Sequence, residues 1–130
     1  MINRVEAIVD AISKLNGCSN NPESDSYQLR NPLMVRSFAR PGKHEVNNDG
    51  VRAFSSLLAG YKAGVFDMTL KLSGKSRAGL KPEDTLENLL GCYGIHGKAA
   101  TDNIVSWLRR SLKDDSISAR TELSFFLENK

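Results

Sequence analysis

The residues of this 130-residue chain that could cleave a sugar chain lie mainly in its first third. Glu23 and Glu45 stand in segments rich in turn-forming residues, and Asn16-Gly17 ends a stretch with a regular apolar period. Cleavage of a glycosidic bond normally needs a carboxylic acid, held protonated in a groove, to protonate the leaving oxygen. The second carboxylate is dispensable where water or the substrate's own acetamido group replaces it. The question is whether one Glu is well placed.

The elements that would hold such an acid are mostly helical, since apolar residues recur at a 3.6-residue period. The turn signals Pro41-Gly42 and Asp49-Gly50 predict a hairpin or exposed loop over residues 39–50, with a short strand after it at 51–54. We therefore expect one domain over residues 1–130, of the α+β class, mainly helical, with a small β-hairpin. The helices are expected over residues 3–16, from Ser55 or Ser56 to 72, over 83–92, from a Thr101 cap to 113, and from Ser116 or Ser118 to about 128.

Bulk properties narrow the class of protein only slightly. The net charge of +3 and the pI near 9.0 weakly favour any polyanion as a partner. No apolar run approaches the roughly 20 residues that cross a bilayer, and the first residues lack the features of a signal peptide, so we expect neither membrane insertion nor standard secretion. Cys18 and Cys92 have no zinc or redox spacing, and idle thiols are favoured over a disulfide. His44 and His96 are too isolated to predict a metal site, and no cofactor is expected.

Several short motifs follow one another in a distinctive order between residues 5 and 112. Asn31-Pro32 and Arg36 follow the first helix and its loop. The segment "VRAFSSLLAGYKA" then carries Phe54, Ser56, Gly60 and Ala63, "DTLENLLGCYGI" carries Tyr93, and "ATDNIVSWLRR" opens a later helix.

This order resembles the lysozyme-like, peptidoglycan-degrading domains of bacteriophage virion and prophage proteins. Their pattern is a helix ending in Glu-Gly, an Asn-Pro-Gly-Asn-Ile/Leu-Arg turn, a Phe-x-x-Phe-x-Ser/Thr segment before a Gly-x-x-Ala helix, a helix ending in Tyr, and a capped helix. The resemblance implies a lysozyme-like α+β domain in which the β-hairpin borders a substrate groove. It also implies a substrate, the β-1,4-linked N-acetylmuramic acid–N-acetylglucosamine chain.

Two positions depart from the family's pattern. The Gly-Asn that follows Asn-Pro is here Leu33-Met34, and the catalytic Glu of Glu-Gly falls on Asn16. An amide forms hydrogen bonds but has no acidic proton to give, and loss of a general acid costs roughly 10²–10⁴-fold in rate. The resemblance therefore implies a virion-associated protein at the bacterial cell wall whose catalysis is weak or lost, kept for binding or for building the particle. If active, it would be a lysozyme or a lytic transglycosylase.

The same resemblance assigns substrate contacts to Asn31, Arg36, Tyr93 and Ser56. A tyrosine hydroxyl can orient an acetamido group or a water, although Tyr93 could equally be a core tyrosine that closes a helix. Arg36 could meet a lactyl carboxylate, although anchoring the Asn-Pro turn is the favoured role.

Two other classes of function stay open. The first is an active glycosidase that uses Glu45 or Glu23 as its acid. The second is a structural protein, or one that binds DNA or another protein, on the same scaffold. A basic edge could serve nucleic acid, but aromatic residues that would stack on bases are not interleaved with it, and a solvated edge is favoured. That edge comprises Lys62, Lys71, Lys75, Arg77 and Lys81.

Overall fold

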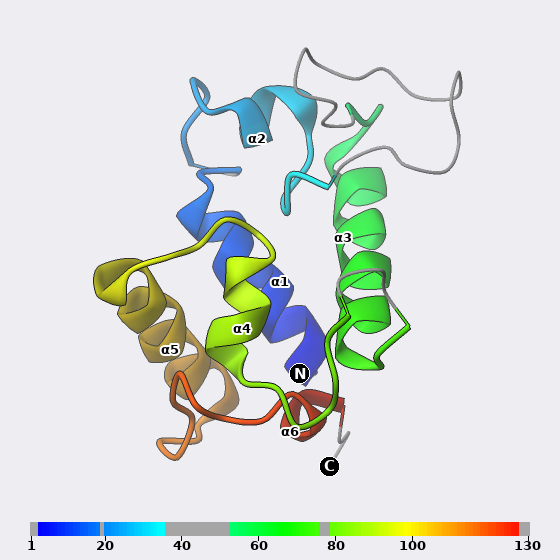
Figure 1. The fold of residues 1–130 in the computed structure, drawn as a ribbon. Coiled ribbons are helices and arrows are strands. Elements are labelled where there is room, and N and C mark those ends of the chain that lie inside the picture. Colours follow the sequence, from blue (N-terminus) through cyan, green and yellow to red (C-terminus); the bar gives the residue numbers. More distant parts are fainter. Residues whose placement is uncertain (1–2, 19, 36–52, 76–78, 128–130) are drawn as a thin grey trace.

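The computed structural model describes residues 3–18, 20–35, 53–75 and 79–127 of the chain (Figure 1). Within these ranges the chain forms helices joined by turns, and the first helix, α1, is the central one. The helices are α1 (Arg4–Leu15), α2 (Asp25–Leu29), α3 (Leu57–Leu72), α4 (Leu86–Gly91), α5 (Lys98–Leu112) and α6 (Ser124–Leu127).

Helix α1 is central because its apolar residues form one broad buried face on which other helices pack. It packs against α5, α3 and α6, and its buried residues form the middle of the single apolar core. Its start is fixed by a capping box, in which Asn3 and Glu6 each accept a hydrogen bond from the other's backbone N–H. The residues that α1 buries are Ala7, Ile8, Val9, Ala11 and Ile12.

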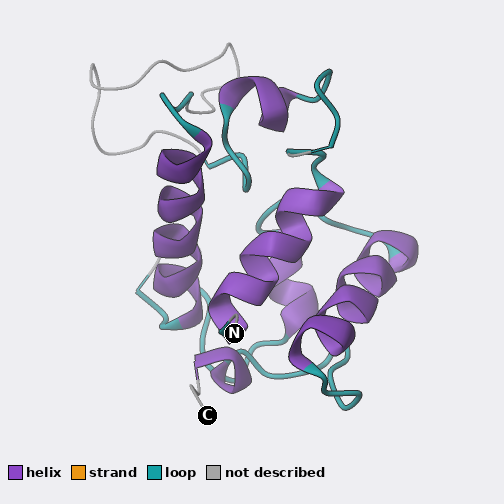
Figure 2. Ribbon diagram, turned by 180° about the vertical axis from the view of Figure 1, so that it is seen from behind, coloured by secondary structure: helices purple, strands orange, loops and turns teal. Residues whose placement is uncertain are grey.

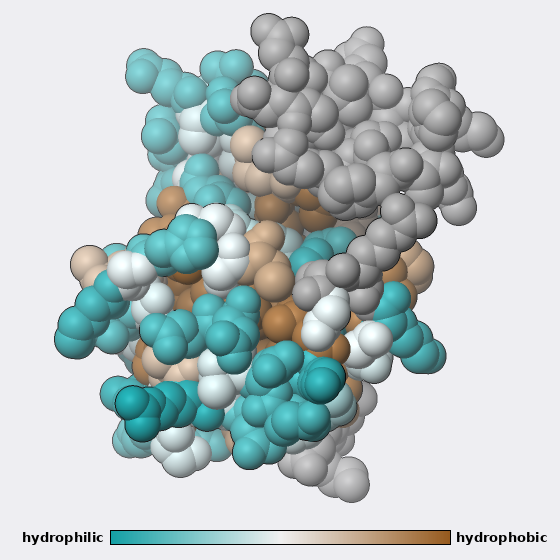
Figure 3. All heavy atoms as spheres, viewed as in Figure 1, coloured by the Kyte–Doolittle hydropathy of each residue, from teal (hydrophilic) through white to brown (hydrophobic). Residues whose placement is uncertain are grey.

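Helices α3 and α5 flank α1 on opposite sides (Figures 1 and 2). The α2 segment lies beyond the C-terminal end of α1, and α6 lies near its N-terminal end. There, the Arg4 guanidinium donates to the carbonyl oxygen of Phe125 at 2.6 Å and stacks over that residue's ring. In the space-filling view, apolar atoms gather in the middle of the visible face and hydrophilic atoms surround them (Figure 3).

The predicted α+β class is wrong. No strand occurs in the described ranges, and their β pairing is limited to one isolated antiparallel bridge between Thr85 and Glu122 (Figure 2). The predicted hairpin at residues 39–50 lies outside the described residues, but Ala53 and Phe54, expected at the end of the following strand, are not in a strand. The Phe54 N–H donates instead to the carbonyl oxygen of Leu29 at 2.9 Å, which joins this segment to the end of α2.

The long helices were predicted well and the short ones poorly. The predictions over residues 3–16 and from Ser55 or Ser56 to 72 are confirmed, with Ser56 as the cap. Helix α5 begins at Lys98, so the predicted Thr101 cap is wrong: Thr101 is buried one turn inside the helix. Helix α4 begins only at Leu86, after a Thr85 cap, and α6 is a single turn. Helix α2 lies where no helix was predicted.

Candidate functional site

The position of the family's acid lies where α1 ends against the Asn-Pro turn. Asn16 is the C-cap of α1, and its side-chain amide donates to the carbonyl oxygen of Pro32 at 3.0 Å. Gly17 follows with φ +75°, the left-handed conformation that glycine adopts without strain and that commonly ends a helix. The Asn16 amide therefore joins the end of α1 to the Asn-Pro turn.

Asn31 is fully buried and supports the turn from inside. Its side-chain oxygen accepts from the N–H of Val35 at 2.9 Å, while its amide group donates to the carbonyl oxygen of the same residue at 3.0 Å. The hydroxyl of Ser26 donates to the Asn31 carbonyl oxygen at 2.8 Å. In this arrangement both polar atoms of the Asn31 side chain hold the backbone of the turn, and its predicted contact with a substrate stays a prediction.

Helix α3 approaches the turn through a glycine. A Cβ added at Gly60 would overlap the carbonyl oxygen of Arg30, so only glycine lets the two backbones come this close. Ser56, a predicted substrate contact, accepts from the N–H of Ala59 at 3.1 Å and so caps α3. The first helix, the turn and the glycine of the third helix thus meet at one corner of the molecule.

The two departures in the turn have different structural consequences. Leu33 is buried and its Cγ would lie 3.1 Å from a Cβ at Gly64, so the larger residue fills space that the second glycine of α3 leaves. Met34 has φ +55°, a left-handed conformation that asparagine adopts far more readily than methionine. The backbone at position 34 is therefore of the kind that the family's asparagine would favour.

Tyr93 does not join this corner through any described contact but forms a cluster with α3. Its hydroxyl donates to Asp67 Oδ2 at 2.7 Å, and Lys71 Nζ donates to the same oxygen at 2.7 Å. Lys71 Nζ also lies 4.6 Å from the centre of the Tyr93 ring. Burial, and then the Asp67 carboxylate, raise the pKa of Tyr93 far above its usual range, so the phenol stays protonated and acts as a donor.

The contact of Asp67 with Tyr93 was not predicted, because a single acidic residue within a long helix is typical of an exposed helix surface. Its partner Lys71, four residues later, is the only hint, since such a spacing is typical of a surface ion pair. Asp67 Oδ2 accepts both hydrogen bonds, so the Asp67 carboxylate acts here as an acceptor and not as a donor.

Of the two acids proposed as substitutes, Glu23 is exposed in a loop, and Glu45 lies outside the described residues, as does Arg36.

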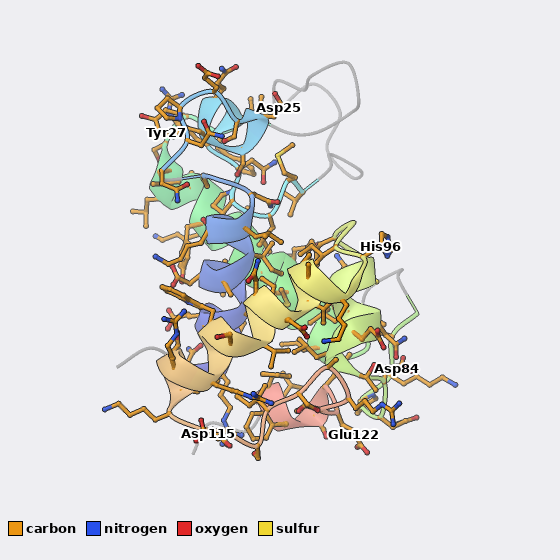
Figure 4. The ribbon with its side chains drawn as sticks, turned by 90° about the vertical axis from the view of Figure 1, so that its left-hand side faces the viewer. Asp25, Tyr27, Asp84, His96, Asp115 and Glu122 are labelled. Carbon is orange, nitrogen blue, oxygen red and sulfur yellow. The ribbon has the colours of Figure 1, made fainter. Side chains whose placement is uncertain are left out.

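A hollow of about 520 Å³ adjoins the turn on the α2 side. Tyr27 and Leu57 are both partly exposed there, and the walls also include Gln28, Arg30 and Cys18. Tyr27 stands at the end of the molecule that α2 forms (Figure 4). The Cys18 thiol is buried and donates to the Ser26 carbonyl oxygen at 3.6 Å, whereas Cys92 is exposed, and both are free thiols.

A second, smaller pocket of about 270 Å³ lies between α1 and α5. Trp107 of α5 donates through Nε1 to Asp10 Oδ2 of α1 at 3.3 Å. Two cations lie against its ring: Lys14 Nζ is 4.4 Å from the ring centre and Arg110 Cζ is 5.3 Å from it. This group was not predicted, because Lys14 and Trp107 are far apart along the chain.

In the part of the chain that the structure describes, no group of three or more His, Cys, Asp or Glu residues could hold a metal ion. Within the same residues, no helix has the length and apolar character required to cross a membrane. Comparison with known proteins finds no match to a family model, to a curated protein or to a solved structure.

Proposed function

We propose that the chain is a non-catalytic relative of the peptidoglycan-degrading domains of phage virion and prophage proteins, and that it binds the peptidoglycan glycan strand at the cell wall as part of a particle. The observation that carries the proposal is the hydrogen bond from the Asn16 amide to Pro32. The Asn16 amide occupies the position of the family's acid but cannot donate an acidic proton. Its role here is to join α1 to the turn.

Two features of the same corner support the kinship. Met34 keeps a left-handed backbone that suits the asparagine of the family's turn, and Gly60 permits the close approach of α3 that a Gly-x-x-Ala helix would make. The left-handed conformation of Met34 does not follow from helical packing in general, since it is uncommon for a residue other than glycine.

The hollow beside the turn supports a binding role. Tyr27 offers an exposed aromatic ring, against which the apolar face of a sugar can pack. Gln28 and Arg30 offer an amide and a guanidinium, and hydroxyl and acetamido groups of a glycan are natural partners for both. The hollow falls within the size range of small-molecule sites, roughly 300–1,000 Å³.

The first experiment measures release of soluble fragments from purified peptidoglycan by the native chain and by Asn16→Glu. A carboxyl group at this position would face the Pro32 carbonyl oxygen, which favours the protonated form, as a general acid requires. We expect the native chain to be inert and Asn16→Glu to release fragments. Asn20→Glu, which adds the same charge at an exposed site nearby, is the matched control and should stay inert.

The second experiment measures retention of the native chain on insoluble peptidoglycan. Tyr27→Ala should weaken retention several-fold, whereas Phe66→Ala, which removes an exposed aromatic ring from α3, should not. Fragment release by the native chain would show that a different acid is active. Absence of retention, together with an inert Asn16→Glu variant, would overturn the proposal.

A further inference from the structure

The pocket between α1 and α5 is built around the only tryptophan of the chain. Lys14 of α1 and Arg110 of α5 both lie against the Trp107 ring, at distances at which a cation and an aromatic ring attract each other. Helices α1 and α5 lie side by side in both Figure 1 and Figure 4. Two positive charges from distant parts of the chain are therefore held at the mouth of one pocket.

The expected partner of Lys14 is engaged elsewhere. Asp10 precedes Lys14 by four residues on α1, the order that favours a helical ion pair, yet Asp10 accepts the Trp107 N–H instead. Among the described residues, neither Lys14 nor Arg110 makes an ion pair or a side-chain hydrogen bond. Both cations therefore lie against the ring, and among the described residues their N–H groups have no protein acceptor.

The remaining walls combine apolar and polar groups. Leu15 is 40% exposed, and the exposed Asn103 contributes an amide that can both donate and accept hydrogen bonds. The volume of about 270 Å³ lies just below the roughly 300–1,000 Å³ of sites that enclose a whole small ligand. A site of this size suits one unit of a longer chain that continues past the pocket.

We propose that this pocket binds a carboxylate-bearing sugar unit of an acidic polysaccharide. The guanidinium of Arg110 matches the two oxygens of a carboxylate, Lys14 adds a second positive charge, and the Asn103 amide suits a sugar hydroxyl that both donates and accepts. The site is distinct from the hollow beside the Asn-Pro turn and does not require the proposed function to hold.

The geometry favours an acidic sugar over a nucleic-acid base. Single-stranded nucleic acid binds by stacking bases on exposed aromatic faces, whereas cations lie against the Trp107 ring here. A base that stacked on the part of the ring that Lys14 or Arg110 covers would displace that cation and lose its attraction to the ring. A carboxylate meets the cations without moving them.

The single tryptophan makes the test direct, since the tryptophan fluorescence of the whole chain comes from the pocket. The probe is an oligosaccharide of polygalacturonate, titrated at low salt and again at higher salt. We expect a saturable change of Trp107 emission that weakens with salt, because exposed charges are screened. Neutral dextran oligosaccharide of the same length should cause no change.

Variants locate the binding. Lys14→Gln and Arg110→Gln should each weaken binding about fivefold, the upper range for one exposed charge pair. Lys62→Gln, which removes an exposed lysine from α3, is the matched control and should bind as the native chain does. Trp107→Phe, followed by calorimetry instead of fluorescence, should bind more weakly because phenylalanine offers no N–H to Asp10 and a weaker platform for the cations.

Three outcomes would overturn the proposal. An emission that does not respond to polygalacturonate would show that the pocket does not bind it. An equal loss in Lys62→Gln would show attraction by net charge alone. A stronger response to oligothymidylate than to polygalacturonate, at equal charge and salt, would assign the pocket to nucleic acid instead.

Discussion

The side-chain amide of Asn16 donates to the carbonyl oxygen of Pro32 at 3.0 Å, and this bond links the end of α1 to the Asn-Pro turn. Asn16→Ala would leave the buried Pro32 oxygen without this donor, so we expect the free energy of unfolding to fall by about 1 kcal/mol. Urea unfolding measures the change. Asn20→Ala, at an exposed position, should stay within about 0.5 kcal/mol of the native chain, and an equal loss in both would mean that the bond contributes nothing specific.

Gly60 and Gly91 give a matched pair of substitutions with opposite signs. In Gly60→Ala the new methyl group would overlap the Arg30 carbonyl oxygen, so α3 and the turn must separate, at a cost of about 2–3 kcal/mol or more. In Gly91→Ala the nearest atom is His96 Cε1 at 3.5 Å, an ordinary contact. Since Gly91 ends α4, alanine should stabilise by up to about 1 kcal/mol. Thermal unfolding of both variants tests this, and a harmless Gly60→Ala would contradict the close approach.

Met34→Asn tests whether position 34 carries backbone strain. A left-handed conformation costs a typical L-residue about 1–2 kcal/mol, and asparagine tolerates it better than methionine does. We expect Met34→Asn to be more stable in urea unfolding than Met34→Leu, by about 1 kcal/mol, because leucine keeps both the strain and the apolar side chain. If the leucine variant proves the more stable of the two, packing of the half-buried side chain outweighs the strain.

The long helices were predictable because their signals are local. The apolar period and Gly17 mark α1, and Ser56 marks the start of α3. The same period predicts that Leu58 is buried on one stripe with Met68 and Leu72, and this prediction is wrong, because Leu58 is 62% exposed. Helix α3 carries apolar residues around its whole circumference, including the exposed Phe66, so periodicity does not identify its buried face.

The candidate site was predicted only as far as local motifs extend. The hydrogen bond that joins Asn16 to the Asn-Pro turn was not predicted. The substrate contacts assigned to Asn31 and Ser56 stay predictions, and in the structure both side chains bind the backbone. A polar residue in a turn motif looks the same in sequence whether it binds a ligand or the backbone. The Asp67–Tyr93 and Lys14–Trp107 contacts join distant segments, and no spacing along one chain reveals such pairs.

Tyr93 should make stability depend on alkaline pH. Its pKa in the folded chain is raised above the ordinary value of 10.0, first by burial and then by Asp67. Below pH 10 both the folded and the unfolded chain keep the phenolic proton, so the contribution is complete. Above pH 10 the unfolded chain loses the proton while the folded chain keeps it, and stability falls by about 1.4 kcal/mol per pH unit from this group.

Tyr93→Phe isolates this contribution, because lysines and the other tyrosines titrate in both proteins. At neutral pH the variant should be less stable by about 1 kcal/mol, since the hydrogen bond to Asp67 is lost. Between pH 10 and 11 its unfolding free energy should decline less steeply than that of the native chain, so the two curves converge. Tyr27→Phe, at an exposed site, should follow the native slope throughout. Parallel curves for the native chain and Tyr93→Phe would show that the Tyr93 phenol ionises as readily in the folded as in the unfolded chain, contrary to its burial beside Asp67.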